Sequence, residues 1–222
     1  MLIEYIYHSS FRINMRDENF LFDYYRGELP KMDLGKVFIS HSHKDHYNPE
    51  VLKLKGDFQY FLSDDIVLEN PSVDNFHFLK PNQSLKYENM NINSFGSTDL
   101  GISMHICVDN VNIFFAGDLN LWIWPEDSED ERKQMNSDFL DIINRICEYP
   151  VDIAFFPVDP RLGKFTTEGA QIFIDKVKPK YFIPMHFSEN VDKIEDYIKK
   201  LKLGKTKLHL LKNPGDKIEV KM

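Results

Sequence analysis

Short runs rich in apolar residues recur along the chain, and they predict β-strands. Strands are expected at 2–7, 11–15 and 20–25, and a short apolar run at 36–40 leads into His41. The middle of the chain predicts further strands at 58–63, 76–79, 84–87, 90–95, 102–108 and 111–116. The last predicted strands are 151–158, 181–185, 208–211 and 217–220.

Helical spacing of apolar residues also occurs in the second half of the chain. A helix is expected over 128–148, and a second one, capped by Thr166 or Thr167, should stop before Pro179. A third covers 191–203. Strand-rich stretches followed by helices, with no seam between them, predict an α+β fold in which two sheets pack face to face with helices outside.

Length and composition are those of a globular protein without disulfides. With 222 residues, 42% of them hydrophobic, the chain is expected to form a single domain, 1–222, with a large core. Asn48 and Pro49 predict one more helix start within it. The cysteines, Cys107 and Cys147, have no metal-site spacing and are expected to be free and mostly buried.

The charge pattern limits the partners. A formal net charge of −8 repels phosphate backbones, so nucleic acid is an unlikely partner and a small-molecule substrate is favoured. The lysine run within 199–207 is interpreted as the solvated end of a helix. No apolar stretch is long enough for a signal peptide or a membrane span, so a cytoplasmic location without membrane attachment is expected.

The segment His41-Ser42-His43-Lys44-Asp45-His46 is the main chemical signal in the sequence. Side chains alternate in an extended segment, so His41 and His43 point the same way. The turn into the next helix can then bring Asp45 and His46 to a second position. Imidazoles and a carboxylate in this spacing indicate a site for zinc, iron or manganese.

Two later strands also end in potential ligands. The apolar run 111–116 leads through Gly117 to Asp118, and the strand 181–185 leads to His186. Binding groups are common at strand ends, because the rigid sheet holds them in place there. Asp118 and His186 are therefore candidate ligands of the same site.

These segments together resemble the metallo-β-lactamase superfamily. The similarity rests on HSHKDH at 41–46, FFAGD at 114–118 and IPMH at 183–186, and it runs from Leu2 to Val220. The opening, YIYHSSFRI followed by NFLFDYY, is similar to the branch that includes ascorbate-6-phosphate lactonase-like hydrolases. The resemblance implies a four-layer αβ/βα sandwich with a two-metal centre, most simply of zinc, at one edge.

The resemblance also assigns roles to individual residues. It implies that His41 and His43 hold the first metal, that Asp118 bridges, and that a set of three residues holds the second metal: Asp45, His46 and His186. Asp23, in FLFDYY, matches the family's aspartate that supports the metal ligands without binding the metal itself. Metal-bound histidines need such carboxylate partners to fix their tautomer.

One expected ligand is missing. Where the family supplies a further histidine to the first metal, this chain has Ser97, while Asp99 lies two residues away as a possible oxygen ligand. His105 is interpreted as a packed or hydrogen-bonded strand residue. The alternatives are two metals with Asp99 or water completing the first site, one metal at the second site, or a site completed by substrate.

Such a centre predicts hydrolysis of an ester, lactone or phosphoester of a small, anionic metabolite. A metal ion lowers the pKa of a bound water to roughly 7, so hydroxide becomes available, and Asp45 and Asp118 would be the catalytic carboxylates that hold the metals and orient it. The alternatives are a phosphodiesterase or nuclease of the same fold, oxygen chemistry at an iron pair, and a scaffold that binds metal or ligand without catalysis.

Some neighbouring residues are candidates for the substrate cleft. Trp122 and Trp124 follow Asp118 closely and either wall the cleft or pack their own loop. His8 either reaches the cleft or makes a structural hydrogen bond. Arg161 either pairs with Asp159 or meets an anionic substrate. Neither the substrate nor the oligomeric state can be read from the sequence.

Overall fold

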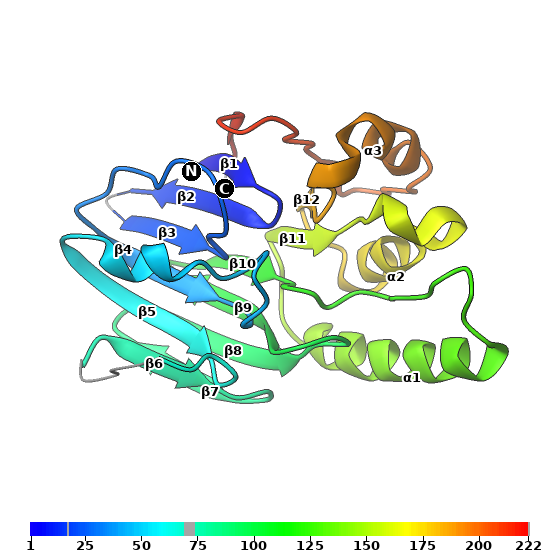
Figure 1. Cartoon of the computed structure of the whole chain (residues 1–222), viewed down its shortest axis with the longest axis horizontal. Coiled ribbons are helices and arrows are strands. Elements are labelled where there is room, and N and C mark those ends of the chain that lie inside the picture. The colour runs from blue at the N-terminus through cyan, green and yellow to red at the C-terminus, as the bar shows by residue number, and fades with distance from the viewer. Residues whose placement is uncertain (17, 69–73, 222) are drawn as a thin grey trace.

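Two mixed β-sheets lie face to face in the computed structural model, which describes residues 1–16, 18–68 and 74–221 (Figure 1). The described part of the first sheet has seven strands in the order β14 (Lys217–Glu219), β1 (Leu2–Tyr7), β2 (Ser10–Met15), β3 (Glu18–Phe22), β4 (Leu34–Ile39), β5 (Asp57–Ser63) and β6 (Phe76–Leu79). The second has the order β13 (Lys207–Leu208), β12 (Tyr181–Met185), β11 (Ile153–Pro157), β10 (Val111–Phe115), β9 (Ile102–Val108), β8 (Met90–Gly96) and β7 (Ser84–Tyr87).

Aromatic side chains fill the space between the sheets. Phe22 of β3 stacks on Phe115 of β10 with ring centroids 4.8 Å apart, and Phe11 of β2 lies 4.7 Å from Phe155 of β11. All four side chains are fully buried. Burial of rings this large on both inner faces makes one hydrophobic core common to the two sheets.

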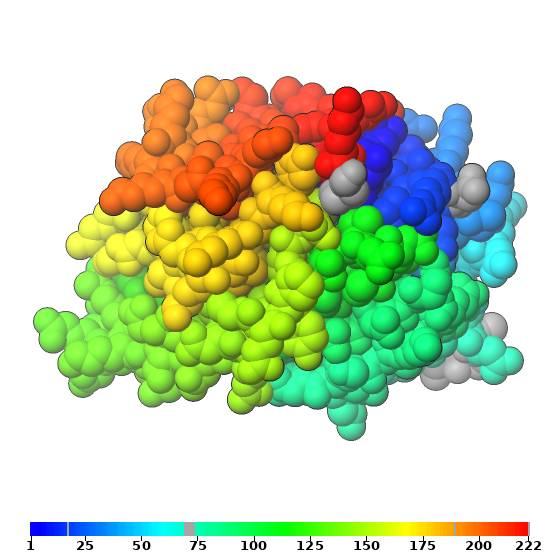
Figure 2. Space-filling view, turned by 180° about the vertical axis from the view of Figure 1, so that it is seen from behind, coloured from blue at the N-terminus to red at the C-terminus, as the bar shows by residue number. Residues whose placement is uncertain are grey.

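The three described α-helices, α1 (Glu129–Ile146), α2 (Glu168–Val177) and α3 (Val191–Ile198), lie on the side of the second sheet (Figure 1). Phe173 of α2 contacts Phe114, Phe156 and Phe182 on the outer face of that sheet. Seen from behind, the segments from α2 to the C-terminus, yellow to red, adjoin one another on the surface (Figure 2). None of the described helices is long and apolar enough to cross a membrane.

The outer face of the first sheet has a thinner cover. The helix predicted to begin at Asn48 is a short 3₁₀ helix, η1 (Pro49–Lys53), whose start is capped by the Asn48 side chain. Val51 of this turn is buried against apolar residues of β4 and β5. The α+β sandwich predicted from the sequence is therefore present, with η1 and loops as its fourth layer.

Several predicted boundaries were wrong. The strand expected over 20–25 stops at Phe22, because Asp23 adopts a left-handed conformation with φ of 40°. The helix expected to reach residue 203 ends at Ile198, and the strand expected over 208–211 is limited to β13. Thr167 stands at the N-cap of α2 but its side chain makes no capping bond.

The cysteine prediction was also wrong in part. Cys107 is half-buried on β9, but Cys147 is exposed after α1. Cys147 follows the last buried residue of the helix, Ile146, so it has already turned away from the core. Both thiols are free.

Candidate metal centre

The candidate metal centre lies where six strands end at one edge of the sandwich. β1, β3 and β4 run in one direction in the first sheet, and β10, β11 and β12 run parallel in the second. The residues that follow these strand ends are His8, Asp23, the segment 41–46, Asp118, Asp159 and His186. Three of them, His8, Asp23 and His186, have positive φ values of 58°, 40° and 67°, a backbone strain that is common at functional sites.

Asp118 lies between two groups of histidines. Its Oδ2 is 3.4 Å from Nε2 of His41, while its Oδ1 is 3.0 Å from Nε2 of His46 and 3.4 Å from Nε2 of His186. The two oxygens of one buried carboxylate therefore face two different sets of donor atoms, which is the arrangement expected of a bridging ligand.

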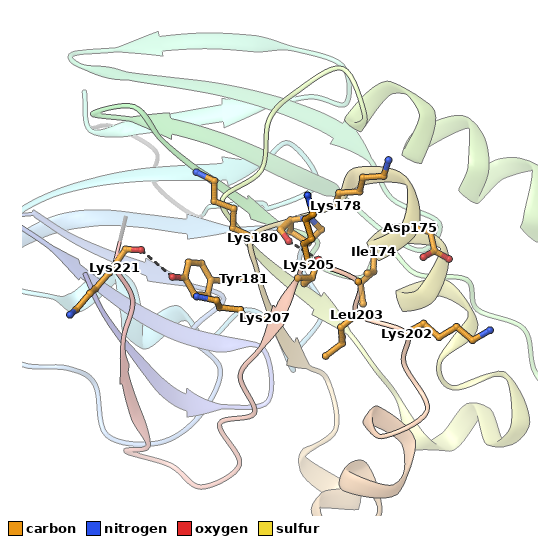
Figure 3. Close-up of a pocket in the computed structure, with 13 residues that line it drawn as sticks. Ile174, Asp175, Lys178, Lys180, Tyr181, Lys202, Leu203, Lys205, Lys207 and Lys221 are labelled. Atoms are coloured by element: carbon orange, nitrogen blue, oxygen red, sulfur yellow. Dashed lines mark hydrogen bonds between the residues drawn. The ribbon is translucent and has the colours of Figure 1, made fainter.

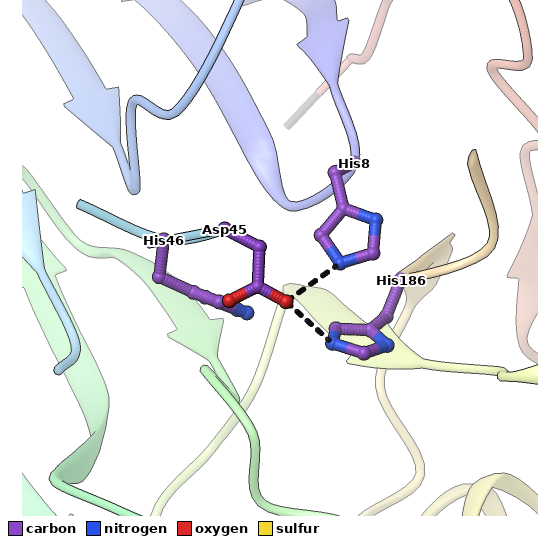
Figure 4. Close-up of side chains that lie close together, drawn as sticks. All are labelled: His8, Asp45, His46 and His186. Carbon is purple, nitrogen blue, oxygen red and sulfur yellow. Dashed lines mark ion pairs between the residues drawn. The ribbon is translucent and has the colours of Figure 1, made fainter. Parts of the chain in front are cut away.

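The set around Oδ1 contains a residue that the ligand prediction did not include. His8, Asp45, His46 and His186 each place one donor atom within 4.8 Å of the others. The rings of His8 and His186 lie on the same side of Asp45, with Nε2 of each 3.7 Å and 4.0 Å from its Oδ2 (Figure 4). His8 is thus a fourth candidate donor.

The set around Oδ2 is more open. His41 is buried, whereas His43 has 46% of its side chain exposed. Asp99 Oδ2 lies 3.6 Å from His43 Nδ1, and Asp99 is 47% exposed. Ser97, at the position of the missing histidine, accepts a hydrogen bond from the Asp99 backbone instead. Asp99 is therefore placed better than Ser97 to add an oxygen to this set.

Unpaired buried atoms show that the residues fit a metal ion. Nε2 of four histidines and Oδ1 of Asp118 are buried without a hydrogen-bond partner in the described structure; the histidines are His8, His41, His46 and His186. The 3.0 Å approach of His46 to Asp118 does not have the geometry of a hydrogen bond. Leaving one buried polar group unsatisfied costs about 1–3 kcal/mol, so five converging ones indicate that a cation belongs among them.

Asp23 orients two of the ligands. Its Oδ2 is 2.7 Å from Nδ1 of His46 and accepts the Ser40 hydroxyl at 2.6 Å, while Ser40 Oγ lies 2.9 Å from Nδ1 of His41. Each Nδ1 is thereby held as a donor, so Nε2 is the nitrogen of each ring that a metal ion beside Asp118 would bind. Asp23 also falls within 4.8 Å of these histidines, but its oxygens are already occupied, so it supports the ligands rather than joining them.

Asp159 supports His186 in the same way. Its Oδ2 is 3.0 Å from Nδ1 of His186, and Arg161 binds the same carboxylate through Nε at 2.8 Å. Burial raises the pKa of Asp159, but the hydrogen bonds from His186 and Arg161 outweigh it and lower the pKa to about 2. Asp159 is therefore an anion that fixes His186 and pairs with Arg161.

The charges at the centre are strongly coupled. Burial raises the pKa of Asp118, but His46 and His186 outweigh it and hold the pKa well below its usual value. Burial lowers the pKa of His46, but Asp118 and Asp23 hold it well above its usual value. Burial and the neighbouring His186 and His46 lower the pKa of His8 to about 2, so His8 is neutral and its contact with Asp45 is not an ion pair.

A pocket of about 530 Å³ opens onto the centre, with His43, Asp45, Asp118 and His186 at its base. Trp122 donates its Nε1 hydrogen to the Asp118 carbonyl at 2.8 Å and stacks with Trp124. Trp122 therefore holds its own loop in place, while the rings of both tryptophans line the pocket.

Other histidines have structural roles, as predicted. His105 Nε2 contacts the Pro150 carbonyl at 2.9 Å, His77 contacts Gln59, and His209 stacks on Tyr181. For His8 both alternatives stay predictions: its Nε2 has no hydrogen-bond partner among the described residues, and it is not one of the residues that line the pocket at the centre. The sequence reasoning missed Ser40, although a small hydroxyl residue directly before His41 was a usable signal.

The chain is thus a two-sheet sandwich protein with a candidate metal centre at one edge of the sandwich. Residues 2–186 match the family described as the β-lactamase superfamily domain, so the chain belongs to that superfamily. The lactonase-like branch within it stays a prediction.

Solved structures with this fold share little sequence with the chain. Igni18, a metallo hydrolase from the hyperthermophilic archaeon Ignicoccus hospitalis, has a TM-score of 0.68 at 18% identity, covering 99% of both chains. YhfI, a metallo-β-lactamase fold protein from Bacillus subtilis, has a TM-score of 0.64 at 12% identity, covering 98% of both. CmlA, a diiron β-hydroxylase from Streptomyces venezuelae, has a TM-score of 0.62 at 13% identity, covering 99% of this chain and 54% of its own. No curated protein matches the chain.

Proposed function

We propose that the chain is a metal-dependent hydrolase that cleaves an ester, lactone or phosphoester bond of a small molecule. The observation that carries this proposal is Asp118, whose two carboxylate oxygens face two sets of unpaired histidine nitrogens beneath an open pocket. Zinc is the first choice and iron or manganese the alternatives, because all of them accept imidazole and carboxylate ligands. A metal bound there would polarise the substrate and lower the pKa of bound water.

The chain's own residues have separate roles around the metal. Asp45 and Asp118 would be the carboxylates that hold the centre together, and His8 would add a neutral imidazole to the Asp45 set. Its lowered pKa keeps His8 in the neutral form, which is the form of imidazole that binds a metal ion. On the more exposed side, His43 and Asp99 leave room for substrate to approach.

The pocket lining limits the substrate class. A volume of about 530 Å³ suits a small molecule, and the two tryptophans offer an aromatic wall. Beyond the candidate ligands the lining carries Asp127 and Glu131, and its arginine, Arg161, binds the Asp159 carboxylate. Substrate anionic charge is therefore best accommodated next to the metals. The acidic lining disfavours the phosphate backbone of a nucleic acid, so it also disfavours the nuclease alternative.

The test is hydrolysis by protein that has been stripped of metal and reloaded separately with zinc, manganese or ferrous iron. Chromogenic esters, lactones and phosphodiesters are the probes. We expect hydrolysis only after reloading, and a loss of at least about 100-fold in Asp118→Ala. Asp141→Ala, which removes an exposed aspartate of α1, is the matched control and should retain activity.

Other outcomes would point to the remaining candidates. Metal binding without hydrolysis of any probe would support the non-catalytic scaffold. Turnover that requires iron, oxygen and a reductant would support oxygen chemistry, the kind of centre that CmlA's description as a diiron hydroxylase suggests. Hydrolysis that survives metal removal would contradict the proposal.

A further inference from the structure

A second pocket, of about 620 Å³, lies away from the metal centre. It is formed by the C-terminal end of α2, the segment 202–207 and the first residue of β12, Tyr181. His186 follows the other end of that strand, roughly 17 Å away at about 3.3 Å per residue. This pocket shares no lining residue with the pocket at the metal centre.

The second pocket is lined by an unusual concentration of positive charge. Six of the chain's 21 lysines line it, although the chain as a whole has a net charge of −8. These are Lys178, Lys180, Lys202, Lys205, Lys207 and Lys221 (Figure 3). The acidic side chain in the lining, Asp175, accepts a hydrogen bond from Gln171. Like charges gathered round a cavity attract anions and repel one another when it is empty.

Most of these lysines have no acidic partner. Lys180 pairs with Asp152 at 2.6 Å, and Lys207 lies over the ring of Tyr181 at 5.6 Å. The other four form no ion pair within the described part of the chain. Their charge is therefore available to a ligand.

The rest of the lining is apolar or aromatic. Ile174 and Leu203 lie among the lysine side chains (Figure 3). The half-buried ring of Tyr181 is fixed by its hydroxyl, which donates to the Lys221 carbonyl at 3.1 Å. A lining that combines apolar and aromatic side chains with lysines fits a ligand that has a ring or apolar body and several negative charges.

We propose that this pocket binds a small phosphorylated molecule with a ring body, of the nucleoside polyphosphate class. The lining has lysines and no arginine, and lysine binds phosphate as a point charge, whereas paired recognition of a carboxylate favours arginine. The volume is that of a small-molecule site. The inference does not depend on the chemistry of the metal centre.

The test is calorimetric titration of the metal-loaded protein with ATP in excess magnesium, which keeps ATP from stripping the metal. Adenosine is the uncharged counterpart. We expect ATP to bind and adenosine not to bind measurably. The double variant Lys202→Glu/Lys205→Glu should bind ATP at least about 10-fold more weakly, because two phosphate contacts become repulsive. Lys86→Glu/Lys193→Glu, with the same change in net charge on exposed residues elsewhere, should bind within about 2-fold of the wild type.

A further variant separates the two sites. Asp118→Ala should bind ATP like the wild type, because the pocket lies at the other end of β12. The proposal is overturned by no binding of ATP, by equal weakening in both lysine variants, or by weakening confined to Asp118→Ala. Binding of a single-stranded oligonucleotide without binding of ATP would also overturn it, in favour of a nucleic-acid surface.

Discussion

At the scale of single residues, the fully buried carboxylate of Asp23 supports two candidate ligands of the HSHKDH segment. It reaches His46 directly and His41 through the Ser40 hydroxyl. Its backbone is held as well, because the Asp23 amide donates to Phe38 and its carbonyl accepts the Ser10 hydroxyl. One side chain therefore fixes the tautomers of ligands in both donor sets.

We expect Asp23→Asn to weaken metal binding by about 10- to 100-fold without unfolding the protein. The amide keeps the size of the side chain but cannot accept from the Ser40 amide, the Ser40 hydroxyl and His46 together. Competition with a chelator of known affinity measures the effect. Asp141→Asn on the surface of α1 is the control, and equal affinities in the two variants would contradict the assigned role of Asp23.

Residues that follow apolar strands could be recognised from the sequence, but their partners could not. HSHKDH, Asp118 and His186 were identified as candidates by residue type and strand position. Asp23 reaches Ser40 only because β3 pairs in parallel with β4. Asp159 reaches His186 only because β11 pairs with β12. Such pairings join residues 17 and 27 positions apart and leave no local pattern in the sequence.

At the scale of elements, the loop before β9 passes very close to the end of β4. Gly101 has a φ of 74°, and a Cβ there would lie 2.2 Å from the Ser40 carbonyl oxygen and 2.5 Å from Cβ of His41. We expect Gly101→Ala to displace His41, to destabilise the fold by about 2–4 kcal/mol and to lower metal content.

Gly204 offers the matched control for this substitution. It has a similar φ of 57°, but a Cβ there would meet nothing within 4 Å. Gly204→Ala should cost only the backbone strain of about 1 kcal/mol and leave metal content unchanged. Thermal denaturation and elemental analysis of both variants provide the measurement, and equal losses in the two would show that contact with β4 is unimportant.

The ion pair between β11 and β12 should make stability depend on acid pH. Asp152 accepts from the Asn112 amide at 2.8 Å and from Lys180 at 2.6 Å. Burial raises its pKa, but these partners outweigh it, so the folded pKa lies below the usual 3.8. A lowered folded pKa gives stability that is present above 3.8 and is lost as pH falls through the folded value.

We therefore expect Asp152→Asn to be less stable than the wild type by about 1 kcal/mol above pH 5, after allowance for solvent screening. The difference should shrink as the pH falls below about 4, where the wild-type carboxylate becomes protonated. Urea unfolding at several pH values measures it. A difference that stays constant down to pH 2 would contradict the interpretation.

Strands were predicted better than the C-terminal helix. Short runs rich in apolar residues mark strands directly, so β1, β9 and β12 have the expected ends. Beyond Ile198 the chain still buries Leu201 and Leu211 in the core, but without regular structure. Apolar spacing reports burial, and burial continues past the last helical hydrogen bond, so the spacing alone could not locate the helix end.

At the scale of the whole molecule, the two sheets share one core, which supports the single domain proposed for the chain. We expect Phe155→Ala to cost about 3–5 kcal/mol, because Phe155 is fully buried between the sheets beside Phe11 and Phe22. Phe78→Ala, at a ring that is 39% exposed on the edge strand β6, should cost less than about 1 kcal/mol. Urea unfolding followed by near- and far-ultraviolet circular dichroism should give coincident transitions; separate ones would contradict a common core.

We propose that the strand ends of both sheets together form a metal centre joined by Asp118. Metal content by elemental mass spectrometry, on protein purified without chelator, tests it most directly. We expect about two equivalents in the wild type and in Asp141→Ala, and less than about one in Asp118→Ala, because Asp118 faces both donor sets. Wild-type protein that holds no metal after loading with zinc, iron or manganese, or an Asp118→Ala variant that holds as much as the wild type, would contradict the account.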